Sequence, residues 1–277
     1  MSTFTTADGV TLTYRDNGGS GTPLVMLHGW GQTQAMFRGQ LDGLDRRVVT
    51  LDQRGHGVSE KPHHGYRIAR LAQDLHEFLD HLGAAEVDLL GHSMGASVCW
   101  SYLDQRGSGR VRRFVAVDQP AAVAAVPWMS RTEQTQCGAI FDVAGLLGLG
   151  GELAGEKGDA TREDFVRSMF SGEPRAELWE FVREEIRSTP AYAGVPLLFD
   201  HCAQDWRDVL PRVDVPTLVI GCDGSHVAPS SQEYIAEQIP DARLYVFPVA
   251  EADSHFPFLE NPERFNAVLG EFLDATK

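Results

Sequence analysis

Short apolar runs alternate with longer amphipathic patterns along most of the chain. Seven runs are rich in apolar or β-branched residues and are bounded by turn-forming residues, which is typical of buried strands; they cover residues 11–15, 23–27, 47–51, 87–90, 113–117, 217–220 and 243–247. Helical periodicity occupies residues 68–82, 94–105, 230–239 and 262–275. This alternation predicts an α/β fold with βαβ units and a mostly parallel sheet. We expect the first two runs to form an antiparallel hairpin at one edge.

The alternation stops between residues 121 and 200. This segment contains a glycine-rich stretch at 145–151 and an amphipathic pattern at 178–188, and it predicts helices and loops without strands. An insertion of this size between two strands favours a helical cap over the sheet edge, although a helical excursion without ligand contact would give the same pattern. We therefore expect a core in two parts, residues 1–120 and 201–277, with a helical cap at 121–200.

One junction between a strand and a helix carries a candidate nucleophile. The sequence VDLLGHSMGASVCW (87–100) places Ser93 between an apolar strand and a small-residue helix, with Gly91 and Gly95 beside it. A G-x-S-x-G pattern alone is weak, but small residues around a serine at this corner allow the strained turn that exposes its hydroxyl. A serine in a structural turn is the alternative.

A serine hydroxyl needs a base and oxyanion donors to act as a nucleophile. His255 lies just after the last predicted strand, and its loop opens on the same sheet edge as Ser93. We expect the two side chains to meet there with a hydrogen bond between them. The backbone N–H groups of Met94 and Trp30 are the candidate oxyanion donors. His28 and Gly29 precede Trp30 in a turn next to the site, where His28 is more readily a packed turn residue than a base.

Composition and charge exclude several other classes of function. The chain has 24 Lys and Arg residues against 39 Asp and Glu residues, and its formal net charge of −15 disfavours nucleic acids and anionic membranes as partners. Four cysteines without C-x-x-C spacing are too sparse to staple 277 residues, so we expect reduced thiols and a cytoplasmic protein. The N-terminal residues do not have the pattern of a signal peptide. Adjacent His63 and His64 have no spaced partners for zinc, so no metal site is predicted.

Four motifs together resemble the α/β-hydrolase family. They are LHGWGQ (27–32), LDQRGHGVS (51–59), GHSMG (91–95) and SHFPFLENPERF (254–265), and they occur in matching order over nearly the whole chain. The resemblance implies an eight-stranded core, a helical cap after strand six and serine chemistry without a cofactor.

The carboxylate that would orient His255 is ambiguous. Members of the family place it after strand seven in a G-x-x-D-x-x-x-P loop, but the corresponding residue here is Ser225. Asp223 lies in the same loop, and Asp118 directly follows strand six. We favour Asp118, because strand six neighbours the serine strand and because some α/β-hydrolases, including quinolone-cleaving dioxygenases, are similar in this respect. Asp118 as a structural turn residue remains the alternative.

The expected reaction is cleavage of a carboxylic ester, thioester or lactone through an acyl-enzyme on Ser93, as in a carboxylesterase or lactonase. Three alternatives stay open: a cofactor-independent dioxygenase or carbon–carbon lyase acting on an aromatic or quinolone-like substrate, a non-haem haloperoxidase or perhydrolase, and a weakly active binding protein of the same fold. The expected ligand is a small hydrophobic acyl or aromatic compound. The oligomeric state, a homodimer included, is open.

The substrate wall is predicted to be apolar and aromatic. The candidate lining residues, besides His28 and Gly29 in the turn, are Trp30, Phe37, Trp128, Met129 and Phe256. For each large side chain an ordinary place in the core is the alternative.

Overall fold

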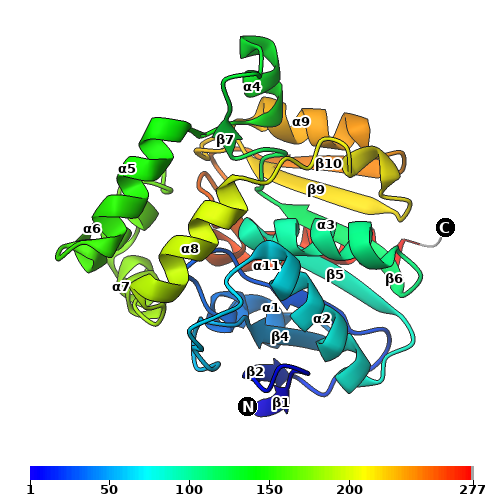
Figure 1. Cartoon of the computed structure of the whole chain (residues 1–277). Helices are drawn as coiled ribbons and strands as arrows, with labels where there is room; N and C mark the ends of the chain where they lie inside the picture. Colours follow the sequence, from blue (N-terminus) through cyan, green and yellow to red (C-terminus); the bar gives the residue numbers. More distant parts are fainter. Residues whose placement is uncertain (276–277) are drawn as a thin grey trace.

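One eight-stranded sheet organises the chain, of which the computed structural model describes residues 1–275 (Figure 1). Its strands are β1 (Ser2–Thr5), β2 (Thr11–Asp16), β3 (Leu24–Leu27), β4 (Val48–Asp52), β5 (Val87–His92), β6 (Val111–Val117), β9 (Thr217–Cys222) and β10 (Ala242–Phe247). Their order across the sheet is β1-β2-β4-β3-β5-β6-β9-β10. All pairs from β4 to β10 are parallel, and the pairs β1–β2 and β2–β4 are antiparallel. The predicted α/β class and eight-stranded, mostly parallel sheet are confirmed.

The central strands are covered on both faces, which explains their continuous apolar sequences. Every residue of β3, β4, β5 and β9 is buried. A parallel sheet with helices on both sides requires such two-sided burial. These strands were therefore the easiest elements to predict from the sequence.

The predicted edge hairpin between residues 11–15 and 23–27 is wrong. β2 pairs instead with β1 and with β4, whereas β3 lies between β4 and β5. The sequence STFT of β1 has one buried residue, Phe4, so its pattern of polar and apolar residues gives almost no strand signal. The edge hairpin of the sheet is formed by β1 and β2.

Helices cover both faces of the sheet. The core helices are α1 (Arg38–Gly43), α2 (Ile68–Leu82), α3 (Met94–Arg106), α9 (Pro229–Gln238), α10 (Pro257–Glu260) and α11 (Pro262–Asp274), with 3-10 turns at Gln34–Phe37 and Leu210–Arg212. Buried residues of α2, α3 and α9 belong to one hydrophobic cluster, and those of α10 and α11 belong to a second cluster. The long helices expected from periodicity all form.

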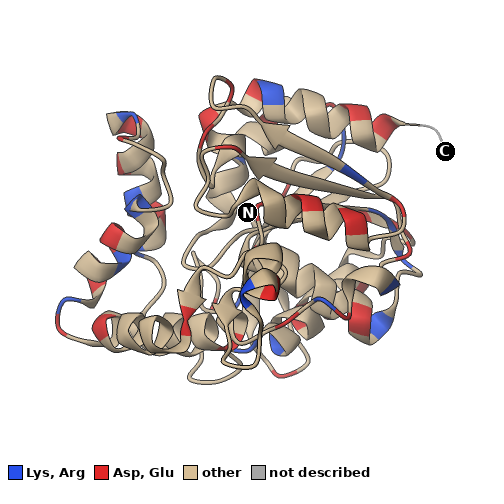
Figure 2. Ribbon diagram, turned by 90° about the horizontal axis from the view of Figure 1, so that it is seen from above, with Lys and Arg blue, Asp and Glu red and all other residues tan. Residues whose placement is uncertain are grey.

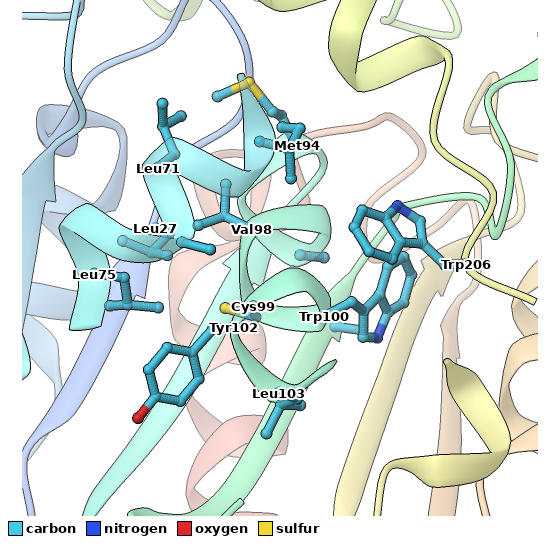
Figure 3. Packing of buried hydrophobic residues seen from close by; sticks show 14 of the residues in the cluster. Leu27, Leu71, Leu75, Met94, Val98, Cys99, Trp100, Tyr102, Leu103 and Trp206 are labelled. Atoms are coloured by element: carbon cyan, nitrogen blue, oxygen red, sulfur yellow. The ribbon is translucent and has the colours of Figure 1, made fainter. Parts of the chain in front are cut away.

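The helix that follows Ser93 is buried nearly all round. Residues 94–103 of α3 are all buried, because the helix packs against both the sheet and α2 (Figure 3). Its side chain Trp100 lies 6.2 Å, between ring centroids, from Trp206. The Trp206 Nε1–H donates a hydrogen bond to the Ser97 hydroxyl at 3.0 Å. These contacts join α3 to the segment that follows α8.

Five helices lie between β6 and β9 and form what we call the helical insert, residues 121–202. They are α4 (Arg131–Cys137), α5 (Val143–Ala154), α6 (Gly158–Arg167), α7 (Ala176–Ile186) and α8 (Ala191–Cys202). The expectation that this segment contains no strands is wrong in one detail, because β7 (Ala124–Ala125) and β8 (Phe141–Asp142) form a short parallel pair. In Figure 1, α5 to α8 stand together on one side of the sheet.

The helical insert contacts the loops at the carboxyl ends of the parallel strands. The indole N–H of Trp30, after β3, donates to the carbonyl of Gly194 in α8 at 2.7 Å. The backbone N–H of His255, after β10, donates to the carbonyl of Met169, which follows α6, at 3.2 Å. The insert therefore covers the sheet edge at which ligands bind in open α/β folds.

Acidic and basic residues are interspersed over the outer helices and loops (Figure 2). The excess of acidic over basic residues is thus spread over the surface and is not confined to one block. Across residues 1–275, no helix has the combination of length and apolar character needed to cross a bilayer.

Candidate active site

Ser93 occupies a strained turn between β5 and α3. β5 ends at His92 and α3 begins at Met94, so the serine alone makes the corner. Its backbone has φ 52° and ψ −125°, a conformation that costs a non-glycine residue about 1–3 kcal/mol. Such strain persists only where the surrounding structure imposes it. This geometry is the one expected of a nucleophile elbow.

Close backbone packing explains the glycines on either side of the serine. A Cβ added to Gly95 would lie 2.2 Å from the carbonyl oxygen of Leu27, and one added to Gly91 would lie 2.4 Å from the backbone nitrogen of Ala96. Neither distance is compatible with a side chain. The pattern GHSMG is therefore a steric requirement of the place where β5, α3 and the end of β3 meet.

His255 and Asp118 form a buried hydrogen-bonded pair. The Nδ1–H of His255 donates to Oδ2 of Asp118 at 2.6 Å. The two residues are 2% and 0% exposed, respectively. Asp118 directly follows β6, and its backbone also has a positive φ of 50°. Two residues that are 137 positions apart thus meet at the carboxyl ends of β6 and β10.

The structure brings Asp118, and not Asp223, to the imidazole. Asp223 is exposed to solvent, and its backbone N–H is bound to the carbonyl of Phe247 at 3.0 Å. Ser225, which stands where the family motif has its acid, donates its hydroxyl hydrogen to Oδ2 of Asp118. The Ser225 hydroxyl oxygen in turn accepts from the Val227 N–H at 3.1 Å. The serine at the motif position therefore supports the carboxylate of Asp118.

Burial sets the protonation of this pair. Loss of solvent lowers the pKa of His255 below its ordinary value, so the ring is neutral at neutral pH. Because Nδ1 carries the hydrogen bonded to Asp118, the neutral tautomer leaves Nε2 as a free base. Burial raises the pKa of Asp118, while the hydrogen bond from Ser225 acts in the opposite direction. The result is a ring with an unprotonated Nε2, whose Nδ1 is bound to a carboxyl group that favours a positive charge on the ring.

Ser93 and His255 line the same small cavity beneath the helical insert, with a volume of about 40 Å³. Within residues 1–275 the Ser93 hydroxyl has no hydrogen-bond partner, so the expected bond to His255 is not formed in this state. Nucleophile and base commonly approach hydrogen-bonding distance only when substrate is bound. The shared cavity is the feature that joins Ser93 to the His255–Asp118 pair.

Two backbone N–H groups lie beside the serine without acceptors. The turn after β3 approaches Ser93 closely, since a Cβ added to Gly29 would lie 3.1 Å from the Ser93 Cβ. In the described part of the chain, neither the Trp30 nor the Met94 backbone N–H donates a hydrogen bond. Met94 is also the first residue of α3, where the helix dipole favours negative charge. Both groups are thus available to an oxyanion.

His28 is part of the scaffold of this turn. It is fully buried, and burial lowers its pKa to about 4. Its Nδ1–H donates to the carbonyl of Gly29 at 2.8 Å, and its Nε2 accepts from the Gln53 N–H at 3.1 Å. Both ring nitrogens are therefore used to hold Gly29 and the turn against Ser93.

The structure places one of the large side chains expected in the substrate wall on the cavity. Trp30 lines the cavity. Phe37 instead packs in the core, 5.1 Å from Phe258 between ring centroids, and Phe256 packs behind His255 at 5.2 Å. Trp128 is 81% exposed, and Met129 is buried in the hydrophobic core. None of Phe37, Trp128, Met129 and Phe256 lines the cavity. The sequence does not show which side chains of a loop or of the helical insert face inward.

Several residues of the cavity escaped the sequence analysis. The apolar part of the wall comes mainly from the helical insert, through Phe141, Phe165, Met169 and Leu198. Two histidines, His201 and His226, also line it. The position of His226 beside Ser225 was a usable signal, because that loop normally carries the acid. The sequence around His201 offered none.

His92 contacts the catalytic base candidate, His255, through a hydrogen bond and through its ring. Its Nε2–H donates to the backbone carbonyl of His255 at 2.8 Å, and the two rings lie 4.5 Å apart between centroids. His92 Nδ1 lies 3.1 Å from Oε1 of Gln32, whose oxygen also accepts from the Gly29 N–H at 3.1 Å. The residue before the nucleophile thus connects the base loop to the turn after β3.

Comparison with known proteins agrees with the fold. The family model described as "alpha/beta hydrolase fold" matches residues 22–262. A non-heme chloroperoxidase of Kitasatospora aureofaciens is 28% identical over 285 residues, covering 99% of this chain and all of that protein. An esterase of Exiguobacterium antarcticum superposes with a TM-score of 0.88 at 24% identity, over 99% of each chain.

A second solved structure, an esterase of a Rhodococcus species, superposes with a TM-score of 0.81 at 26% identity over the full length of both chains. The family match extends from the residues just before β3 to the start of α11 and includes the elbow, the loop after β6 and the loop after β10. The sequence match and the sheet order agree on one conclusion. The chain belongs to the α/β-hydrolase fold family.

Proposed function

We propose that this protein is a serine hydrolase that cleaves a carboxylic ester, thioester or lactone of a small hydrophobic substrate. One observation carries the proposal: the His255–Asp118 pair, joined at 2.6 Å, shares a buried cavity with Ser93 on its strained turn. A histidine and a carboxylate in this relation are what a serine needs in order to become a nucleophile.

In the first half of the reaction, the Ser93 Oγ attacks the carbonyl carbon of the substrate. Nε2 of His255 takes the hydroxyl proton, and Asp118 stabilises the imidazolium that forms. The negative charge on the carbonyl oxygen is received by the N–H groups of Trp30 and Met94. When the carbon–oxygen bond to the alcohol breaks, His255 returns the proton to the leaving oxygen. The products of this half are the free alcohol and an acyl ester of Ser93.

In the second half, a water molecule attacks the acyl carbon while His255 again acts as the base. The tetrahedral intermediate collapses, the bond to the Ser93 Oγ breaks and the proton passes from His255 to that oxygen. The carboxylic acid leaves and the serine is regenerated. Every proton transfer uses Nε2 of His255, which is the nitrogen left free by the bond to Asp118.

We assign the role of a cap to the helical insert. Its side chains Phe141, Phe165 and Met169 make the cavity wall apolar, which suits a hydrophobic acyl group. The cavity volume of about 40 Å³ is too small for most esters, because ligand sites usually enclose about 300–1,000 Å³. We therefore expect the insert to move away from the sheet edge to admit substrate.

Perhydrolysis is a second candidate, favoured by the full-length similarity to a non-heme chloroperoxidase. In this reaction hydrogen peroxide replaces water in the second half and attacks the acyl carbon. The bond to the Ser93 Oγ breaks, and the products are a peracid and the free serine. The same Ser93, His255 and Asp118 serve both reactions, so the two activities differ only in the nucleophile that enters.

The experiment that tests the proposal combines labelling with turnover. A fluorophosphonate probe is expected to modify Ser93 alone, and the wild-type protein is expected to hydrolyse a short acyl ester. Ser93→Ala should abolish both the labelling and the ester hydrolysis while the protein stays folded, because alanine fits the same turn. Ser101→Ala is the matched control, since Ser101 lies in α3 and bonds to Gln105 at 2.7 Å. Full turnover by Ser93→Ala, or oxygen uptake with a hydroxyquinolone in place of ester cleavage, would overturn the assignment.

We further propose that the protein works in a reducing compartment such as the cytoplasm. All four cysteines, Cys99, Cys137, Cys202 and Cys222, are buried and unpaired. Buried free thiols of this kind are typical of proteins that are not exposed to oxidising conditions. Fractionation of cells that express the full chain tests this proposal.

A further inference from the structure

Two imidazoles in the cavity, His201, which is buried, and His226, which is partly buried, have no role in the proposed reaction. His201 lies near the end of α8 in the helical insert, and His226 lies in the loop after β9. Both line the cavity together with Ser93. The Nδ1 atoms of both rings are buried without a partner, and no side-chain hydrogen bond is formed by either histidine within the described residues.

Two other buried histidines, His28 and His56, have both ring nitrogens hydrogen-bonded. His28 donates through Nδ1 to the carbonyl of Gly29 and accepts at Nε2 from the Gln53 N–H. His92 donates through Nε2 to the carbonyl of His255. His56 accepts from the Gly31 N–H at 3.1 Å and donates to the carbonyl of Arg54 at 3.0 Å. Leaving a buried polar group unpaired costs about 1–3 kcal/mol, so two such rings in one cavity require an explanation. A ligand in the cavity would supply the missing partners.

The two rings reach the cavity from different sides. His201 comes from the insert, next to the cavity residues Leu198 and Cys202. His226 comes from the core, and its ring packs edge-on against that of His255 at 4.6 Å between centroids. A substrate held at Ser93 would therefore meet one imidazole on the base side and one on the insert side.

The charge state of both rings limits what they recognise. Burial lowers the pKa of His201 and of His226 to about 3, so both are neutral at neutral pH. A neutral imidazole offers one N–H donor and one acceptor nitrogen and attracts no net charge. The partner that suits this pair is therefore an uncharged oxygen, such as a hydroxyl or a carbonyl, and not a carboxylate or a phosphate.

We propose that His201 and His226 form a polar subsite that hydrogen-bonds a second, uncharged oxygen of the substrate, in addition to the ester or lactone carbonyl. The inference rests on the proposed function and narrows its substrate class to hydroxy- or oxo-substituted esters and lactones. Apart from Gln32 and Gln119, the wall beyond Ser93 and His255 is mainly apolar. An unsubstituted acyl chain offers no polar atom to His201 or His226, so it leaves both rings without partners. A site whose buried polar groups bind a substrate oxygen rejects the analogue without that oxygen more strongly than an apolar pocket rejects an analogue without one methylene group.

The test compares ethyl 3-hydroxybutyrate and ethyl 3-oxobutyrate with ethyl butyrate, which has the same chain length. For the wild-type protein, kcat/KM is corrected for the alkaline hydrolysis rate of each ester. The corrected kcat/KM should be at least about tenfold higher for one oxygenated ester than for ethyl butyrate. A factor of about ten corresponds to one net hydrogen bond of about 1.4 kcal/mol. His201→Phe and His226→Phe should reduce this ratio towards one. His201→Gln and His226→Gln should retain part of it, because glutamine keeps a donor and an acceptor. His64→Phe, at an exposed histidine outside the cavity, is the control and should keep the ratio.

Binding to the Ser93→Ala variant separates this inference from the proposed function. The Kd of each intact ester can be measured without turnover, and the oxygenated esters are expected to bind at least about fivefold more tightly, a difference of about 1 kcal/mol. Equal affinities would mean that the two rings bind only water, and they would overturn the subsite. Equal corrected kcat/KM values in the wild type, with Ser93 labelled and all three esters cleaved, would overturn the subsite and leave the hydrolase standing. Selective binding without any ester turnover would leave the subsite standing and remove the hydrolase.

Discussion

Asp118→Asn removes one negative charge beside His255 without removing an oxygen acceptor. The amide oxygen can take the place of Oδ2, where the His255 Nδ1–H and the Ser225 hydroxyl both donate. The amide NH2 then takes the place of Oδ1, which is buried without a partner in the described structure. We expect the variant to fold with little change in the position of the imidazole. What it loses is the charge that stabilises the imidazolium during the reaction.

The size of the loss follows from the geometry of the pair. The Nδ1 and Oδ2 atoms are 2.6 Å apart. Charge centres about 4 Å apart interact by about 4 kcal/mol at an effective dielectric constant of about 20. This energy corresponds to a rate factor of about 10³, and the same substitution in a serine protease lowers kcat by about 10⁴. We therefore expect kcat/KM to fall by about 10³–10⁴-fold.

The assay is kcat/KM for a short acyl ester, measured with thermal unfolding of the same preparations. Asp223→Asn is the matched control: it makes the same change of charge in the loop after β9, at an exposed residue. It should change kcat/KM by no more than about threefold, because an exposed charge is screened by solvent. A larger loss for Asp223→Asn than for Asp118→Asn, or a loss below about tenfold for a folded Asp118→Asn protein, would refute the reasoning.

Two further predictions concern stability. Six buried or partly buried histidines have pKa values lowered by burial, namely His28, His56, His92, His201, His226 and His255. The unfolded chain therefore binds more protons below pH 6.5 than the folded chain does. The free energy of unfolding should fall by several kcal/mol between pH 7.5 and pH 5.5, at about 1 kcal/mol for each histidine. Urea unfolding at three pH values measures this change, and a free energy that does not vary with pH would contradict the neutral state of these rings. Gly95→Ala should destabilise the protein by about 3 kcal/mol, because the added Cβ would lie 2.2 Å from the Leu27 carbonyl oxygen. The control Gly148→Ala in α5, which has open space around it, should be neutral or slightly stabilising. Equal melting temperatures of the two variants would contradict the close packing at the elbow.

Local chemistry was sufficient to predict the elbow and the main helices. The order strand, glycine, serine, glycine, helix describes a turn whose steric limits lie within a few residues, and the structure has Ser93 at φ 52° there. The helix predicted at residues 68–82 forms as α2 with the same bounds, because its apolar spacing reports a single buried face. Structural features that depend only on residues close together in the sequence can be predicted from the sequence.

Tertiary structure decided which acid meets His255. Both Asp118 and Asp223 follow a parallel strand, and chain order does not distinguish them. The structure distinguishes them through burial: the loop after β9 turns Asp223 to solvent and directs Ser225 onto Asp118. That contact joins residues 107 positions apart, and no local pattern in either segment encodes it.

The lining of the cavity was even harder to predict from the sequence than the acid. The sequence located the helical insert, but three of the aromatic residues expected in the wall lie elsewhere, whereas Phe165, Met169 and His201 face the cavity. The inward face of the insert depends on how its helices pack, since α5 contacts α6 and α8, α6 contacts α7, and α4 packs against α9 of the core. The sequence by itself determined the elbow, the position of Ser93 and the alternation of the core, because these follow from backbone sterics and from periodic burial. Only the tertiary structure decided the acid, the lining of the cavity and the placing of His201 and His226, because these are contacts between segments that are distant in the chain.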